Sequence, residues 1–140
     1  MNKPSYEILE HPADVGLRVY GRTLAELFVH GGHGLAAIAL EAEDSGSTEH
    51  VSLSAQGADL EDLLVNWLSE ILYYMDAEGW VFRDFRIQKI GDNMIEGEGW
   101  GERRDPARQQ HSVAVKAVTY HQLSVRKTEE GWEAVVYLDI

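Results

Sequence analysis

Apolar residues recur every three or four positions between residues 60 and 75, a spacing that predicts a long amphipathic helix. Asp59 stands where an N-cap is needed, and Gly79 supplies a residue that can end the helix in a left-handed conformation. The apolar face consists of Leu60, Leu63, Leu64, Trp67, Leu68, Ile71, Leu72 and Met75. One face of this helix is therefore expected to pack on the core.

A second helix is predicted to begin at Leu24, because Thr23 and Glu26 form a capping-box pattern. Its apolar face is interrupted by the run HGGHG at residues 30–34, and each glycine costs up to about 1 kcal/mol relative to alanine inside a helix. The run lacks the lysine and hydroxyl residue of a phosphate-binding loop, and its two histidines have no identifiable third metal ligand. We interpret the glycines as positions where the helix approaches the sheet closely.

Alternating apolar and polar residues predict strands before the first helix, between the helices and through the last part of the chain. The expected strands are 6–10, 17–20, 51–55, 81–90, 94–100, 113–120, 123–127 and 132–139. The sequence predicts an α+β fold, in which two main helices pack on a mostly antiparallel β-sheet. Residues 1–140 are expected to form a single two-layer domain.

The composition excludes several classes of protein. With 140 residues, 44% hydrophobic and 26% charged, the chain is typical of one globular domain. It contains no cysteine, which rules out disulfides, thiol catalysis and zinc fingers. No apolar run is long enough to cross a bilayer, and the first residues lack a signal core, so we expect a cytoplasmic protein without membrane association. No coiled-coil pattern is present, which favours a monomer or weak dimer.

Acidic residues outnumber basic ones by 24 to 12, and the formal net charge is −12. Phosphate backbones are bound by clustered positive charge, so we expect no direct high-affinity binding of nucleic acid. An acidic protein can instead dock on the basic surface of an enzyme that acts on nucleic acid. The densest basic cluster is Arg103, Arg104 and Arg108. We interpret it as a solvated loop with local salt bridges to Glu102 and Asp105, with a phosphate clamp as the alternative.

Three oxygen donors are candidates for a metal site. Asp139 is adjacent to the terminal carboxylate of Ile140, and Asp14 lies in the stretch 11–16, whose proline and glycine predict a turn. Ligands that are all oxygen suit calcium, magnesium or manganese. Nothing in the spacing alone places Asp14 beside the chain end, so separately solvated carboxylates remain the alternative.

Lys116 is a further candidate, because it occupies the second face of the predicted strand 113–120 and is close in sequence to two hydroxyl side chains and His121. An ordinary polar strand face explains this pattern equally well.

Several segments, in order along the chain, resemble motifs of the archease family. They are HPADVG at 11–16, LAELF at 24–28, DLLVNWL at 62–68 with Glu70, KAVTYH at 116–121 and WEAVVYLDI at 132–140. The resemblance covers essentially the whole chain.

This resemblance implies a small cytoplasmic protein cofactor of the RtcB-type RNA ligase. That ligase joins RNA 3′-phosphate or 2′,3′-cyclic-phosphate ends to 5′-hydroxyls with GTP and manganese. The resemblance implies that the protein promotes guanylylation of the ligase histidine, and so multiple turnover in tRNA splicing and RNA repair, without making the RNA bond itself. It also implies a divalent cation held by Asp14, Asp139 and the terminal carboxylate of Ile140, and a functional role for Lys116.

Two other functions remain as alternatives. The first is a stand-alone metal-dependent phosphohydrolase that uses Asp14 and Asp139, with His121 as the plausible base. The second is a chaperone-like interaction module that contains a purely structural ion.

Overall fold

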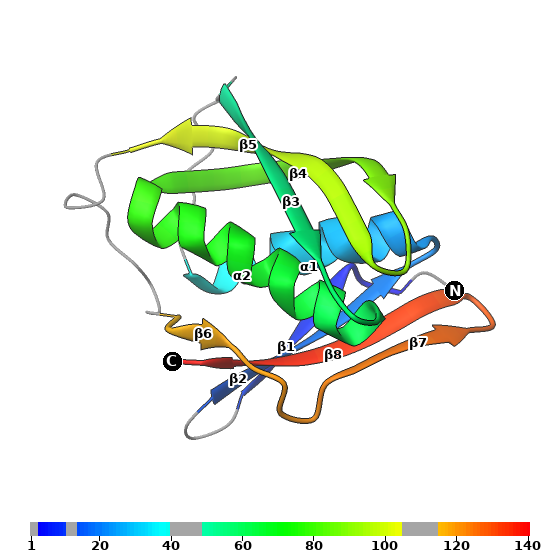
Figure 1. Cartoon of the computed structure of the whole chain (residues 1–140). Coiled ribbons are helices and arrows are strands. Elements are labelled where there is room, and N and C mark those ends of the chain that lie inside the picture. Colours follow the sequence, from blue (N-terminus) through cyan, green and yellow to red (C-terminus); the bar gives the residue numbers. More distant parts are fainter. Residues whose placement is uncertain (1–2, 11–13, 40–48, 105–114) are drawn as a thin grey trace.

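The computed structural model describes residues 3–10, 14–39, 49–104 and 115–140. Two helices lie between two antiparallel sheets (Figure 1). The elements in chain order are β1 (Tyr6–Glu10), β2 (Asp14–Gly21), α1 (Leu24–Ala39), β3 (Glu49–Gln56), α2 (Leu60–Glu78), β4 (Trp80–Ile90), β5 (Met94–Arg103), β6 (Ala117–Val118), β7 (Ser124–Thr128) and β8 (Gly131–Asp139).

The expected α+β class, with two helices packed on antiparallel strands, is confirmed, but the strands form two sheets instead of one. The first sheet has the order β1-β2-β8-β6, and β7 pairs with β8 next to β6; the second has the order β3-β5-β4. Both helices contact both sheets, so the layers are sheet, helices, sheet. The expected two-layer arrangement is corrected accordingly.

The glycines of α1 explain how one helix can pack between two sheets. A Cβ at Gly32 would lie 2.7 Å from the Phe85 ring on β4, and a Cβ at Gly34 would lie 2.6 Å from a methyl carbon of Leu17 on β2. Gly31 faces α2, where a Cβ would meet Leu68 at an ordinary 3.5 Å. Small residues on several sides of α1 therefore let it approach each layer, which confirms and extends the interpretation of the glycine run.

Helix α2 begins and ends where the sequence predicts. The Asp59 carboxylate accepts a hydrogen bond from the Asp62 backbone N–H at 2.8 Å, and Gly79 ends the helix with φ 78°. The fully buried Trp67 donates its indole N–H to the carbonyl of Phe28 on α1 at 3.1 Å, which satisfies the indole and joins the two helices.

Within the described ranges, no helix is long and apolar enough to cross a membrane.

Some boundaries differ from those predicted. Asp14 is the first residue of β2 and so lies in a strand, where a turn was predicted; residues 11–13 are outside the described ranges. Of the predicted strand 113–120, the structure describes only Ala117–Val118 as strand, and Lys116 precedes it. Arg108 and Asp105 also lie outside the described residues.

Candidate functional site

Asp14 and Asp139 come together although they lie near opposite ends of the chain. Asp14 begins β2, Asp139 ends β8, and the two residues are directly opposite each other in the antiparallel pairing of these strands. Residues opposite each other project from the same face, with Cβ atoms about 4.5–5.5 Å apart. Their neighbours Val15 and Leu138 are buried in the core, so the two carboxylates project from the outer face of the sheet.

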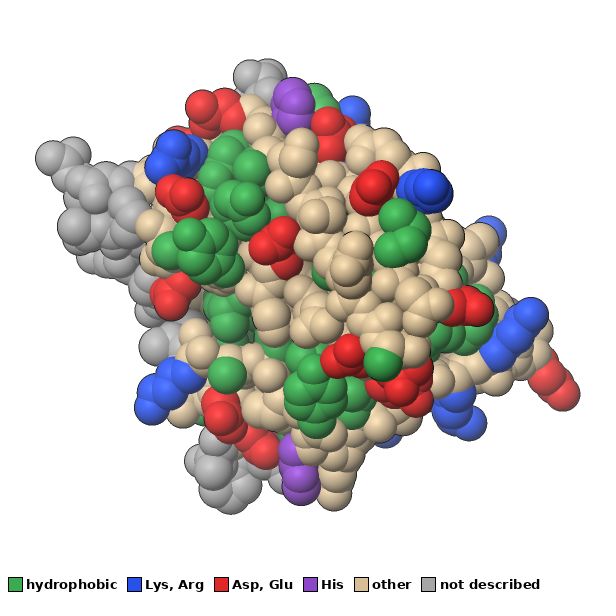
Figure 2. All heavy atoms as spheres, viewed as in Figure 1, with side chains coloured by type: hydrophobic (Ala, Val, Ile, Leu, Met, Phe, Trp, Pro, Cys, Tyr) green, Lys and Arg blue, Asp and Glu red, His purple; other side chains and the backbone are tan. Residues whose placement is uncertain are grey.

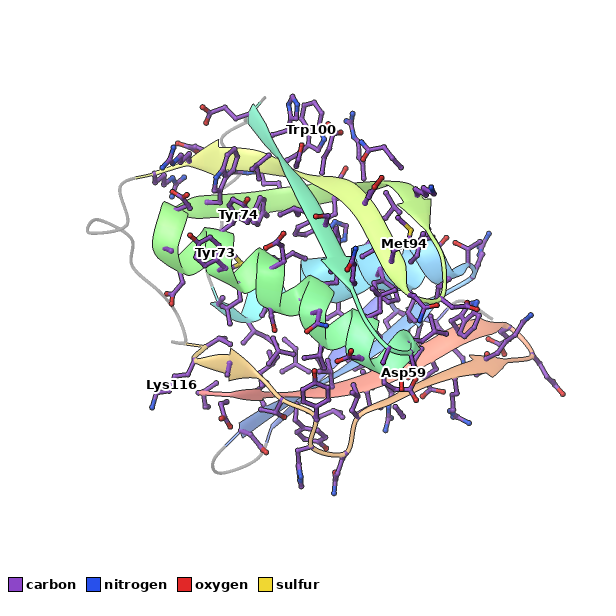
Figure 3. The ribbon with its side chains drawn as sticks, in the orientation of Figure 1. Asp59, Tyr73, Tyr74, Met94, Trp100 and Lys116 are labelled. Atoms are coloured by element: carbon purple, nitrogen blue, oxygen red, sulfur yellow. The ribbon has the colours of Figure 1, made fainter. Side chains whose placement is uncertain are left out.

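The segment around β6 adds Lys116 to the same end of the sheet. The backbone N–H of Lys116 donates to the carbonyl of Asp139 at 2.8 Å, and Ala117 is opposite Asp139 in the pairing of β6 with β8. Figure 3 shows Lys116 beside the end of β8, and its side chain is exposed. Ile140 follows Asp139 and is 38% exposed. The four residues to which the family resemblance assigns a role therefore lie at one end of one sheet.

A buried aromatic ring borders the two carboxylates. Tyr137 is opposite Gly16, and a Cβ at Gly16 would lie 2.8 Å from a carbon of this ring. The ring therefore packs across the glycine, and it is only 7% exposed. His121 stands edge-on to the ring, with 5.8 Å between the ring centroids. The sequence did not predict that the Tyr137 ring borders the carboxylates. The signal for this arrangement is a glycine two residues after Asp14 and a tyrosine two residues before Asp139, which alternation places on the carboxylate face.

The donor chemistry of this end fits a hard divalent cation. Like charges directly opposite each other destabilise a strand pair, and within the described chain no Lys, Arg or His forms an ion pair with Asp14 or Asp139. The described residues also contain no cluster of three or more His, Asp or Glu side chains that could hold a metal. Two facing carboxylates thus suit an ion that keeps other coordination positions for water or a partner.

The two histidines of α1 have separate partners. His30 donates from Nδ1 to the carbonyl of Tyr20 at 2.6 Å, whereas Nε2 of His33 lies 3.2 Å from a carboxylate oxygen of Asp84. The structure therefore engages each imidazole with a different layer of the fold.

The arginines after β5 form local ion pairs. Arg104 lies 3.2 Å from a carboxylate oxygen of Glu102, which confirms that part of the expectation. Arg103 pairs instead with Glu78 on α2 at 2.8 Å and also donates to the carbonyl of that residue. These two guanidinium groups therefore join β5 to its own loop and to the end of α2.

Tyr120 links the segment after β6 to the first turn of α2. Its hydroxyl donates to a carboxylate oxygen of Asp62 at 2.6 Å. This bond lowers the pKa of Asp62, assisted by the backbone N–H of Ala58. The same bond raises the pKa of Tyr120, because it stabilises the protonated phenol.

Comparison with known proteins identifies the family. Residues 6–140 match the Archease protein family (MTH1598/TM1083). The chain belongs to the archease family. It is similar to protein archease of Methanosarcina barkeri (35% identity, 96% of this chain and 95% of the relative) and of Pyrococcus furiosus (36% identity, 96% and 98%). The family resemblance seen in the sequence is thereby confirmed.

A solved structure shares the fold of this archease-family chain. It is the solution structure of Methanobacterium thermoautotrophicum protein 1598, with a TM-score of 0.82 and 24% sequence identity. The match covers 97% of this chain and 99% of the other. The arrangement of two helices between two sheets is therefore an archease-type fold.

Proposed function

We propose that this protein activates an RtcB-type RNA ligase, promoting guanylylation of the ligase and its repeated turnover in tRNA splicing and RNA repair. The observation that carries the proposal is the meeting of Asp14, Asp139 and Lys116 at one end of one sheet in an archease-family chain. The protein acts as a cofactor of the ligase and does not itself join RNA. Its place of action is the cytoplasm, as a monomer or weak dimer.

In this proposal Asp14, Asp139 and the terminal carboxylate of Ile140 hold calcium, magnesium or manganese. A bound divalent cation supplies positive charge that can neutralise nucleotide phosphates. The pairing of β2 with β8 fixes the separation of the Asp14 and Asp139 backbones, because both strands lie inside the same sheet. The ring of Tyr137 restricts water on one side, which strengthens electrostatic attraction there. Lys116 adds a mobile point charge at the exposed side.

Electrostatics supports a protein partner over naked RNA. A net charge of −12 repels a phosphate backbone, whereas it attracts the basic face of an RNA-binding enzyme. Activation is therefore expected to weaken as salt rises.

The deciding experiment is multiple-turnover ligation by the ligase of the same organism, with wild-type protein, Asp14→Ala or Asp92→Ala. Asp92 is an exposed carboxylate after β4 and away from the β2–β8 pair, so its variant controls for the loss of one charge. Stimulation by the wild type and by Asp92→Ala, but not by Asp14→Ala, would support the activator role and the carboxylate site. No stimulation by the wild type would overturn the proposal.

The phosphohydrolase alternative has one observation in its favour, the position of His121 beside Tyr137 on the carboxylate face. Turnover of a phosphoester by the isolated protein with manganese, abolished in both Asp14→Ala and His121→Ala, would favour it. We expect no such turnover, because catalysis would also need a substrate site beside these residues.

A further inference from the structure

Exposed apolar side chains lie near β6 and near the residues that pair with it or follow it. Within the described residues four large hydrophobic side chains are exposed, and three of them adjoin this strand: Tyr73 (55%), Tyr120 (59%) and Ile140 (38%). Tyr73 projects from α2 toward the same side of the molecule as Lys116 (Figure 3). Tyr120 follows β6 by two residues, and Ile140 follows the residue that pairs with Ala117. Exposed tyrosines are typical of interaction surfaces, because tyrosine combines a large apolar area with a polar tip.

A groove lies between α2 and β6, and Tyr73 is part of its lining. Its volume is about 310 Å³. The groove is lined by Ser69, Leu72, Tyr73, Asp76, Ala77, Lys116, Ala117 and Val118. This volume is at the lower end of the range for ligand pockets, so it fits an anchor side chain of a protein better than a free ligand.

The charge of α2 indicates what kind of partner the groove fits. The helix carries five carboxylates and no lysine or arginine. Two of them, Asp76 and Glu78, lie in its last turn, where the helix dipole disfavours negative charge. The negative charge of Glu78 is compensated by the guanidinium of Arg103, which lies 2.8 Å from a carboxylate oxygen of Glu78. Asp76 is exposed and its carboxylate forms no hydrogen bond or ion pair with another described residue, so its unfavourable interaction with the helix dipole is not compensated in the free protein.

The face around α2 has the same character over a wider area. Figure 2 shows acidic side chains scattered around the apolar ones on the side that carries α2. A partner that covers this face must therefore bring both apolar surface and positive charge.

We propose that the groove between α2 and β6 is the surface by which this protein docks on the RNA ligase, with Tyr73 as an aromatic anchor and Asp76 paired with a lysine or arginine of the ligase. The inference rests on the proposed function and adds its contact surface. Lys116 lines the groove and is bonded through its backbone to Asp139. A partner seated in the groove is consequently brought next to the Asp14–Asp139 end.

The test compares a groove variant with a matched control. The groove variant combines Tyr73→Ser with Asp76→Lys. The control combines Ile8→Ser with Asp92→Lys, an equal change in charge and in exposed apolar residues at β1 and the β4–β5 turn. Affinity for the purified ligase is measured by isothermal titration calorimetry. We expect binding by the groove variant to weaken at least about tenfold, as for loss of a central interface residue, and the control to stay within about twofold of wild type.

Failure of this inference is distinguishable from failure of the proposed function. Equal affinities of wild type and groove variant, with ligase stimulation intact, would overturn the docking surface and leave the activator role standing. A wild-type protein that neither binds nor stimulates the ligase would overturn both. If the double variant has a lowered Tm, the affinity of the single variant Asp76→Lys for the ligase decides. Its fold should be unaffected, because the exposed Asp76 side chain has no described partner to lose. Titration with manganese should be unchanged in Asp76→Lys, which separates docking from cation binding.

Discussion

The ring of Phe85 occupies the space where a Cβ on Gly32 would have to lie, 2.7 Å from its nearest carbon. One position earlier, a Cβ on Gly31 would meet Leu68 of α2 at 3.5 Å, an ordinary contact. Two adjacent glycines in one helix therefore have opposite tolerance for a methyl group. The difference arises because the Phe85 ring on β4 lies too close to Gly32 for a Cβ to fit, whereas Leu68 on α2 leaves room for one at Gly31.

We expect Gly32→Ala to lower the free energy of unfolding by about 1–3 kcal/mol, since overpacking forces the ring or the helix to shift. Gly31→Ala should be neutral or stabilising by up to about 1 kcal/mol, because alanine is the better helix former. Urea unfolding of both variants measures the difference. Equal destabilisation of the two would contradict the packing of α1 against β4.

Helix α2 could be predicted from the sequence almost to its ends, because its period, N-cap and C-terminal glycine are all local signals. The division of the strands into two sheets could not. Alternation tells which side chains share a face of a strand, but it does not tell which strand lies beside it. Nor does an apolar stripe reveal that α1, with its glycines facing Phe85 and Leu17, is covered from two sides.

The carboxylate pair shows the same limit. The residue types of Asp14 and Asp139 predicted a candidate metal site, whereas their meeting depends on the register of β2 and β8. The family resemblance supplied the expectation that both aspartates bind one cation. The register places the two residues opposite each other, as such a site requires. Tyr137 and Gly16 were overlooked because a tyrosine and a glycine acquire meaning only once they are known to be opposite each other.

Cation binding between Asp14 and Asp139 should appear in thermal unfolding. Saturating calcium, magnesium or manganese is expected to raise the Tm of the wild type, as a ligand at 100 times its Kd adds about 2.7 kcal/mol. Asp14→Asn should lose this response. Without metal it should be as stable as the wild type or more so by up to about 1 kcal/mol, because it removes one of two facing like charges.

Asp92→Asn serves as the control, since it removes a carboxylate outside the strand pair. It should keep the full metal response. A metal-dependent rise in Tm that persists in Asp14→Asn would place the cation elsewhere. If Asp14→Asn instead had a lower Tm and bound many unrelated partner proteins more weakly to the same extent, the chaperone-like alternative would be favoured.

The bond between Tyr120 and Asp62 should give a pH-dependent contribution to stability. The pKa of Asp62 is lowered from 3.8, chiefly by the Tyr120 hydroxyl, so this contribution is present above that value and lost as pH falls through the folded-state pKa. The pKa of Tyr120 is raised from 10.0 by the same bond, so the contribution is lost again as pH rises through the raised pKa.

Tyr120→Phe should therefore be less stable than the wild type at neutral pH and similar to it in strong acid, as urea unfolding at the two pH values would show. Tyr73→Phe is the matched control, because Tyr73 is exposed to a similar extent and its hydroxyl has no described hydrogen-bond partner. A stability difference that is the same at both pH values would contradict the role of this bond.

Substitution of Lys116 is expected to change ligase stimulation without changing the stability of the fold. Its side chain is exposed, and its described hydrogen bond to Asp139 is made by the backbone, which any residue but proline retains. Lys116→Ala should thus change the free energy of unfolding by less than about 0.5 kcal/mol. It should nevertheless reduce stimulation of the ligase, because the positive charge at this end of the sheet is lost, and Lys116→Arg should restore part of the effect. Lys89→Ala, an exposed lysine on β4, should leave stimulation unchanged. Full stimulation by Lys116→Ala would show that the carboxylate end acts without this charge.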